Sequence, residues 1–260
     1  MEYKLNHELH KGKDKSEIDA SFPKDDNFQT LKNEINMFNL SKQTGLIKNI
    51  KSSHNTNQKL LENGVTIYSK GNYNLNDVST IDVSISTIAT NLSKLCRYSG
   101  NTSKFYSVAE HSTAMSKALL LNYGDVKLAM AGLLHDGSEA FINDILYTVK
   151  QQLGKDSPYI IIEKEIEKHI YKFYGIEQYL DNPIVKHIDV QICNIELEMY
   201  LSNKFVGYSK FFNYKPDFIE KLPEDAEKEF LTQFFFLKYL LETYENKECL
   251  CEVGSHKPKA

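Results

Sequence analysis

The adjacent pair His135–Asp136 closes an apolar run that extends from Leu128 to Leu134. A helix that buries its apolar side has no structural need for an imidazole beside a carboxylate at the end of its inward face. Neutral imidazole nitrogen and carboxylate oxygen are both good ligands for divalent cations. An isolated His–Asp pair is usually an ordinary surface or capping pair, so the prediction of a metal site depends on what else the chain can bring to it.

Two further residues of the same chemistry fall on apolar helical stripes. His111 lies just inside a helix predicted to begin after Ser107, and Asp189 lies two turns into a helix predicted to begin at Pro183. Burying a carboxylate on an apolar face costs several kcal/mol unless something compensates its charge. One shared divalent ion would compensate both residues together with the histidine–aspartate pair. The sequence therefore predicts a metal site built from separate helices.

Length and composition restrict the remaining possibilities. The chain has 260 residues, 41% hydrophobic content and a formal net charge of −4, which allows a sizeable core and does not suggest a surface for nucleic-acid polymers or membranes. No apolar stretch approaches the roughly 18 residues of a membrane span. Four scattered cysteines do not form a disulfide framework, and Cys249 and Cys251 are interpreted as spectator thiols. We expect a soluble, cytoplasmic protein in a reducing compartment.

The chain divides into three parts. Residues 1–63 form a polar extension that we expect to be partly disordered, with a short helix between 28 and 50. Residues 64–248 form the compact domain, which we expect to start with a small β-hairpin made from Val65–Tyr68 and Tyr73–Leu75 around Lys70–Gly71. Residues 249–260 form a polar C-terminal tail.

Hydrophobic periodicity and helix-capping residues predict an all-α bundle for the compact domain. Ser107 and Glu110 form a capping box, and Ser157-Pro158 and Asn182-Pro183 each place a cap before a proline. The predicted helices are, in order, 84–96, 107–121, 125–136, 157–174, 182–203 and 224–244. The aromatic stripe around Phe234 is typical of a core or a subunit interface.

The order of these residues, H…HD…D spread over helices, resembles the HD superfamily of metal-dependent phosphohydrolases. Five blocks of sequence carry the resemblance, which extends from about Gly64 to Leu240. They are Leu95-Cys-Arg-Tyr-Ser-Gly-Asn-Thr102, Tyr106-Ser-Val-Ala-Glu-His-Ser112, Gly132-Leu-Leu-His-Asp-Gly-Ser-Glu-Ala140, Asn143-Asp-Ile145 and the helix that contains Asp189. Within the superfamily they are most similar to the 5′-deoxynucleotidase-like branch, which includes phage and bacterial nucleotide hydrolases. The expected fold is accordingly an HD-domain helical bundle.

The resemblance implies a role for each matching position. The metal ligands would be His111, His135, Asp136 and Asp189, which would hold one divalent ion such as Mn, Co or Zn. Glu139 matches the acid/base carboxylate and Asp144 the second active-site carboxylate. Arg97 matches the arginine that grips phosphate, and Tyr98 an aromatic residue that closes against the sugar. Related sequences often carry Gly-His-Thr where this chain has Gly100-Asn101-Thr102, so any contact of that histidine is missing here.

The implied reaction is hydrolysis of the 5′-phosphoester of a 2′-deoxynucleotide to the deoxynucleoside and phosphate. A related branch releases triphosphate from deoxynucleoside triphosphates, and this alternative stays open. A helical nucleotide-binding module without turnover is the second class of function. The extension could serve separately as a partner-docking arm. A homo-oligomer is expected because several aromatic residues of the C-terminal half look exposed, namely Phe205, Phe211, Phe212 and Tyr214.

Individual residues also have simpler structural interpretations. Glu139 could be a carboxylate that favours a helix start, and Asp144 follows Asn143 in a sequence that suits a turn. Arg97 could pair with any nearby carboxylate. Glu196 lies along the same helix as Asp189 and is interpreted as support for the bundle.

Overall fold

The computed structural model describes residues 65–67, 71–200 and 219–253, and side chains are described for 73–200 and 219–243. The predicted N-terminal extension and its short helix lie outside these residues. So do the four aromatic residues on which self-association was expected, at positions 205–214. The cysteines at 249 and 251 fall in a helix whose side chains are not described there.

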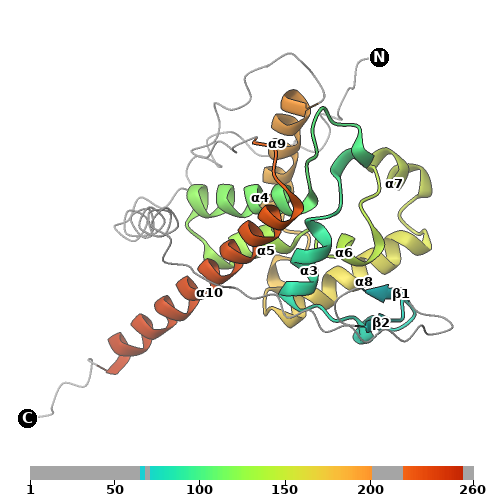
Figure 1. The fold of residues 1–260 in the computed structure, drawn as a ribbon. Helices are drawn as coiled ribbons and strands as arrows, with labels where there is room; N and C mark the ends of the chain where they lie inside the picture. The colour runs from blue at the N-terminus through green and yellow to red at the C-terminus, as the bar shows by residue number, and fades with distance from the viewer. Residues whose placement is uncertain (1–64, 68–70, 201–218, 254–260) are drawn as a thin grey trace, which may run out of the picture.

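The described part of the chain is helical apart from one small hairpin, so the predicted all-α class is confirmed (Figure 1). The α-helices are α3 (Ile85–Leu92), α4 (Val108–Tyr123), α5 (Val126–Leu134), α6 (Glu139–Ile142), α7 (Tyr147–Leu153), α8 (Pro158–Phe173), α9 (Pro183–Tyr200) and α10 (Pro223–Val253). Short 3₁₀ turns are η2 (Val78–Thr80), η3 (Arg97–Gly100) and η4 (Glu177–Tyr179). None of the described helices combines the length and the apolarity needed to cross a bilayer.

Helices α4 and α5 form the antiparallel pair at the centre of the domain. The capping box opens α4, because the Ser107 hydroxyl accepts from the Glu110 amide while the Glu110 carboxylate accepts from the Ser107 amide. Gly124 ends α4 at a φ of 67°, in the left-handed region that glycine enters without steric cost, and Asp125 caps α5 directly afterwards. This short reversal brings the start of α4 beside the end of α5.

The α4–α5 contact is close because of Gly132. A Cβ atom at this position would overlap the Leu119 side chain, which is fully buried. The two helices therefore pack tightly near His135, which follows α5 directly. The turn at Gly124 and the close contact at Gly132 together fix how the start of α4 and the end of α5 meet.

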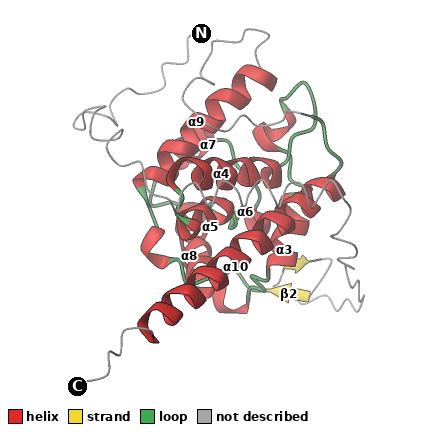
Figure 2. Ribbon diagram, turned by 90° about the vertical axis from the view of Figure 1, so that its left-hand side faces the viewer, coloured by secondary structure: helices red, strands yellow, loops and turns green. Residues whose placement is uncertain are grey.

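Helix α10 covers one side of the central pair. It packs against α3, α4 and α5 and crosses the bundle as one long rod (Figure 2). Phe234, Phe236 and Leu237 face the core, whereas Phe235 is 46% exposed. The stripe around Phe234 is thus core-facing on one side of the helix, as the predicted core interpretation requires.

Several predicted boundaries differ from the observed ones. The second strand of the hairpin is Gly71–Tyr73, which pairs antiparallel with Val65–Ile67, and not 73–75. The helix predicted over 84–96 ends at Leu92, and Cys96 is already extended and forms a β-bridge with Ser107 before the 3₁₀ turn at 97–100. The final helix continues to Val253 and crosses the predicted boundary at residue 248. None of these differences moves a residue of the predicted site to another helix.

Candidate metal centre and its surroundings

Three elements bring the predicted ligands together. His111 lies in the first turn of α4, and the C-terminal end of α5 carries His135 and Asp136. The third element is α9, which packs against α4 and α5 and carries Asp189 in its second turn. Asn182 begins α9 by accepting hydrogen bonds from two backbone amides of its first turn. The antiparallel α4–α5 pair therefore aligns the two histidines, and α9 adds the last carboxylate.

The ligand atoms of these four residues converge. The Nε2 atom of His111 lies 3.2 Å from Nε2 of His135 and 3.2 Å from Oδ1 of Asp189. It lies 3.6 Å from Oδ2 of Asp136. The Nε2 atom of His135 lies 3.2 Å from the same Asp136 oxygen and 3.8 Å from the same Asp189 oxygen. The four atoms thus form two triangles that share the edge between the histidines.

The hydrogen bond at Nδ1 of each histidine ring determines whether its Nε2 atom presents a proton or a lone pair. Nδ1 of His111 lies 2.7 Å from a carboxylate oxygen of Glu196, and Nδ1 of His135 lies 2.8 Å from the carbonyl oxygen of Gly132. Both partners can only accept, so both Nδ1 atoms carry the proton of the neutral ring. Each Nε2 then presents a lone pair. Two nitrogen lone pairs and two carboxylate oxygens face one another.

A divalent cation fits this set of donors. Ligand atoms about 2.1 Å from a common ion lie about 3.0 Å apart in adjacent octahedral positions and about 3.4 Å apart in a tetrahedron. The separations between each histidine nitrogen and the neighbouring ligand atoms are 3.2–3.8 Å, close to both values, and the ligand atoms of His111, His135 and Asp136 all lie within 4.8 Å of one another. Protons can satisfy the same atoms only by placing two imidazolium rings with their Nε2 atoms 3.2 Å apart. A single cation satisfies all of them without that repulsion.

The titration behaviour of these groups agrees with a need for positive charge. Burial alone would lower the pKa of His135, but Asp136 and Asp189 raise it well above the ordinary value. Burial alone would raise the pKa of Asp189, but the two histidines hold it well below its usual range. Without a cation, the acids therefore stay ionised and the imidazoles take up protons. A metal ion would replace those protons.

Glu196 is the residue behind the centre that sequence reasoning undervalued. Its side chain is fully buried. One carboxylate oxygen accepts from the Tyr106 hydroxyl at 2.8 Å and from His111 Nδ1, and the other accepts from the Tyr98 hydroxyl at 2.7 Å. It does support the bundle, as predicted, but it also fixes the tautomer and orientation of His111. Its position seven residues after Asp189, two turns along the same helix, was the available indication.

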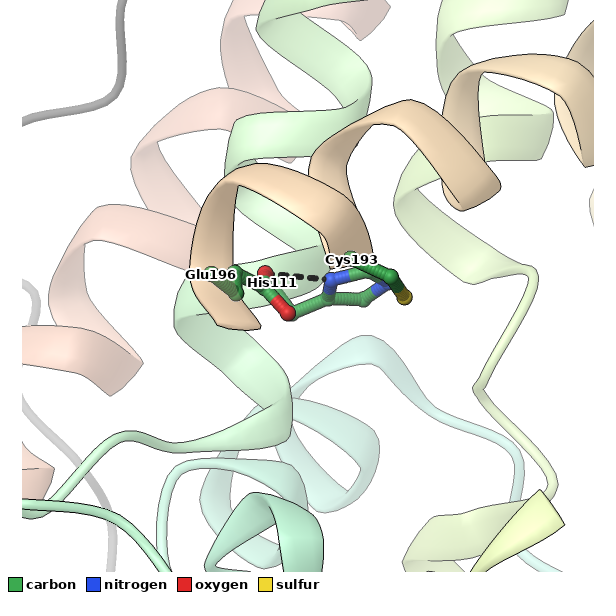
Figure 3. Close-up of side chains that lie close together, drawn as sticks. All are labelled: His111, Cys193 and Glu196. Carbon is green, nitrogen blue, oxygen red and sulfur yellow. Dashed lines mark hydrogen bonds and ion pairs between the residues drawn. The ribbon is translucent and has the colours of Figure 1, made fainter. Parts of the chain in front are cut away.

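A second group of side chains competes for the role of metal site. His111, Cys193 and Glu196 also place ligand atoms within 4.8 Å of one another (Figure 3). However, the Nδ1–Oε1 distance of 2.7 Å is that of a charge-assisted hydrogen bond. Burial and the neighbouring Asp189 raise the pKa of the Cys193 thiol, and this thiol donates to Oδ1 of Asp189 at 3.3 Å. We assign Glu196 and Cys193 to the support of the centre, not to ion binding.

Arg97 lies directly beside the candidate ligands. Its Nη1 is 3.1 Å from the Asp136 oxygen that faces both histidines, and its Nη2 is 3.2 Å from the Cys193 sulfur. Its Nε lies 3.3 Å from Glu196, an ion pair without the alignment of a hydrogen bond. The side chain is 10% exposed. Arg97 thus pairs with carboxylates, which was its simpler interpretation. Its positive charge also lies where a phosphate bound at the centre would need one.

Tyr98 and the 3₁₀ segment that carries it differ from the expectation for the sugar-facing aromatic. Tyr98 and Ser99 have φ values of 55° and 52°. Such values are uncommon outside glycine and asparagine and cost roughly 1–3 kcal/mol each. The Tyr98 hydroxyl donates to Glu196, so the hydroxyl end of the side chain points toward this carboxylate behind the centre. A contact of its ring with a sugar remains a prediction.

The two predicted acidic residues beside the metal centre, Glu139 and Asp144, differ in position and in burial. Glu139 begins α6 and is 4% exposed. Burial and the charges of Asp136 and Asp144 raise its pKa well above the ordinary value. Asp144 follows α6 and is partly buried, and its pKa is raised by burial and by Asp136 against the opposing effect of Arg97. The helix-start role of Glu139 is observed, and it coexists with a carboxyl group held out of water beside the centre.

Comparisons with known proteins do not assign an activity. No family model matches the chain. The sequence is 30% identical over 126 residues to the uncharacterized protein YfdR of Escherichia coli, an alignment that covers 48% of this chain and 66% of YfdR, just under two thirds of its length. It is 27% identical over 148 residues to an uncharacterized protein of Rhodobacter capsulatus, covering 54% of this chain and 74% of that protein.

Proposed function

We propose that this chain is a metal-dependent phosphohydrolase that cleaves the 5′-phosphoester of 2′-deoxynucleotides. The observation that carries the proposal is the convergence of His111, His135, Asp136 and Asp189 beside Glu139. The resemblance of the sequence to HD-superfamily phosphohydrolases supplies the substrate class. Related enzymes use the matching positions in the roles given below.

His111, His135, Asp136 and Asp189 would hold one divalent ion. When bound, such an ion supplies positive charge that activates water and stabilises the charge that develops at a phosphoryl group. Glu196 keeps the His111 ring in the tautomer that a metal requires. His111 is fully buried, whereas the Asp189 side chain is 37% exposed, so a phosphate would approach from the Asp189 side.

Glu139 would move the proton. Its raised pKa keeps this carboxyl protonated to a higher pH than an exposed glutamate. A protonated carboxyl can donate to the departing 5′-oxygen, and after donation the carboxylate can orient the attacking water. One of its oxygens, Oε2, is buried and has no hydrogen-bond partner among the described residues. In the proposed reaction this oxygen would contact the reacting group.

Arg97 and Asp144 would complete the substrate side. A guanidinium carries five N–H groups, and the contacts of Arg97 with protein leave N–H groups on both terminal nitrogens. These can bind a phosphate oxygen with the fixed fork geometry of arginine. Asp144 lies close enough to Asp136 and Arg97 to perturb and be perturbed by them. In the role that the resemblance implies, it would be the second active-site carboxylate, near the substrate.

The experiment is a product assay on the full chain. Metal-free protein would be supplied with Mn, Co or Zn and tested against deoxynucleoside mono- and triphosphates and the corresponding ribonucleotides. We expect phosphate from deoxynucleoside monophosphates, loss of activity in H135A, and a drop of about 10²–10⁴-fold in kcat for E139Q. Release of triphosphate would favour the related triphosphohydrolase branch. Metal and nucleotide binding without any product would contradict the proposal and favour a regulatory module.

A further inference from the structure

Lys150 connects the candidate acid/base residue to two other elements. It lies on α7, and its ammonium group is 3.3 Å from Oε1 of Glu139 on α6. The same nitrogen is 2.6 Å from Oε1 of Glu163 on α8. All three side chains are mostly withheld from water, with exposures of 22%, 5% and 17%. Ion pairs in such surroundings are screened less than those at the surface.

Helix α7 has little else to hold it in place. None of its residues is buried, and Tyr147, Val149 and Leu153 are exposed. It is flanked by Asn143 and Gly154, with φ values of 69° and 82°. A hydrogen bond from the Tyr159 hydroxyl to the Asn143 carbonyl oxygen fixes the chain only before the helix begins. The ion pairs of Lys150 are therefore the main polar attachment of α7 to the described domain.

The two oxygens of Glu139 have different surroundings. Oε1 contacts Lys150, while Oε2 is buried and has no hydrogen-bond partner among the described residues. A carboxylate held through one oxygen by a cation keeps a defined rotation. The shorter contact with Glu163 anchors the ammonium group and thus the direction from which it holds Glu139.

We propose that Lys150 is a positioning residue, anchored by Glu163, that holds Oε1 of Glu139 so that Oε2 is presented to the reacting group. The proposal rests on the proposed function for the role of Glu139. Lys150 itself does not contact the substrate in this account. It determines which oxygen of Glu139 transfers the proton.

The exposed pair Lys186–Asp181 supplies a matched comparison. Its nitrogen–oxygen distance is also 2.6 Å, but the two side chains are 65% and 78% exposed. Surface pairs of this kind contribute little. Removal of the charge at Lys186 should therefore leave the activity unchanged, although the substitution is chemically the same as at Lys150.

The test compares K150M, K150R, E163Q and the control K186M in the full, metal-loaded chain. We expect K150M to lower kcat by about 10- to 100-fold with KM and metal affinity within about threefold of wild type, because the defect lies in orientation. E163Q should lower kcat by less, and K150R should recover most of it. Unchanged kcat in K150M, with an active wild type, would overturn the positioning role while leaving the proposed function intact.

A crystal structure of K150M provides a readout that does not depend on turnover. We expect the Glu139 side chain to adopt a different rotamer while His111 and Asp136 stay in place. An unmoved Glu139 would overturn the proposal. If the wild type turned over no nucleotide but Glu139 moved in K150M, the proposed function would fail and the role of Lys150 as the residue that orients Glu139 would stand.

Discussion

Replacement of Glu196 by glutamine removes the negative charge behind His111 with little change of shape. Glutamine can still accept a hydrogen bond from His111 Nδ1 but no longer balances Arg97, whose Nε lies 3.3 Å from the carboxylate. In metal sites, loss of a residue that orients a ligand lowers metal affinity by about 10- to 100-fold. This corresponds to about 1.4–2.8 kcal/mol of binding free energy.

The same substitution should also weaken the metal-free protein. His111, Arg97 and the Tyr98 hydroxyl together hold the pKa of Glu196 below its ordinary value, although burial alone would raise it. The depressed pKa means that the carboxylate stabilises the fold above the unfolded pKa, and that this stability is lost as pH falls through the folded pKa. Because the interactions involve charged groups, E196Q should lower the free energy of unfolding by about 1.5–3 kcal/mol near neutral pH.

The assay is a titration of the full chain with Mn or Zn in competition with a chelator, with E177Q as the control at an exposed glutamate. We expect weaker binding in E196Q, no binding in H135A and wild-type binding in E177Q. Wild-type affinity in E196Q would refute the orienting role of Glu196. Complete loss in E196Q, together with unchanged binding in D136N and D189N, would place the ion between His111 and Cys193 instead.

Three further predictions concern the helices and the protons of the site. S107A removes the hydroxyl that accepts from the Glu110 amide in the capping box of α4, and it should lower the free energy of unfolding by about 1–2 kcal/mol in urea denaturation; an unchanged midpoint would show that this hydroxyl does not set the start of the helix. G132A should cost about 1–3 kcal/mol through overlap with Leu119, seen as a lower Tm, whereas a neutral effect would contradict the close α4–α5 contact. Metal affinity should rise as the pH increases above 6.5 through the raised pKa of His135, because the ion displaces a proton from this ring. The stability of the metal-free protein should depend on pH with the opposite sign. Protonated His135 stabilises the fold below pH 6.5, and this contribution is lost as pH rises through the folded pKa. If the stability of the metal-free and metal-loaded proteins changed equally with pH, His135 would not be a metal ligand.

The helices that carry the site could be predicted because local chemistry sets their ends. The capping box at Ser107 and the prolines at 158 and 183 each open the helix that they indicate. Apolar periodicity placed His111 and Asp189 on inward faces, and the structure brings them together. The 3₁₀ turn that follows α3 was less predictable, because the positive φ values of Tyr98 and Ser99 are not favoured by either residue type.

The partners around the ligands could not be read from spacing in the same way. The contact of Glu196 with His111 forms only because α9 packs against α4. The contact of Lys150 with Glu163 forms only because α7 approaches α8 across a loop. The spacing of seven residues from Asp189 indicates that Glu196 lies on the same face of α9, but it does not identify its partner on α4. No comparable spacing points to the contact of Lys150 with Glu163. The contacts of Arg97 with Asp136, Cys193 and Glu196 likewise require three elements to be placed first.

The most direct test of the account is the recovery of activity on addition of metal to the metal-free full chain. A deoxynucleoside monophosphate would be supplied in excess, and phosphate release would be followed while Mn is added stepwise. If the four ligands hold a catalytic ion, activity rises until one ion is bound per chain, and H135A and D189N stay inactive over the same range. Phosphate release that is independent of metal, or that persists in both variants, would contradict it.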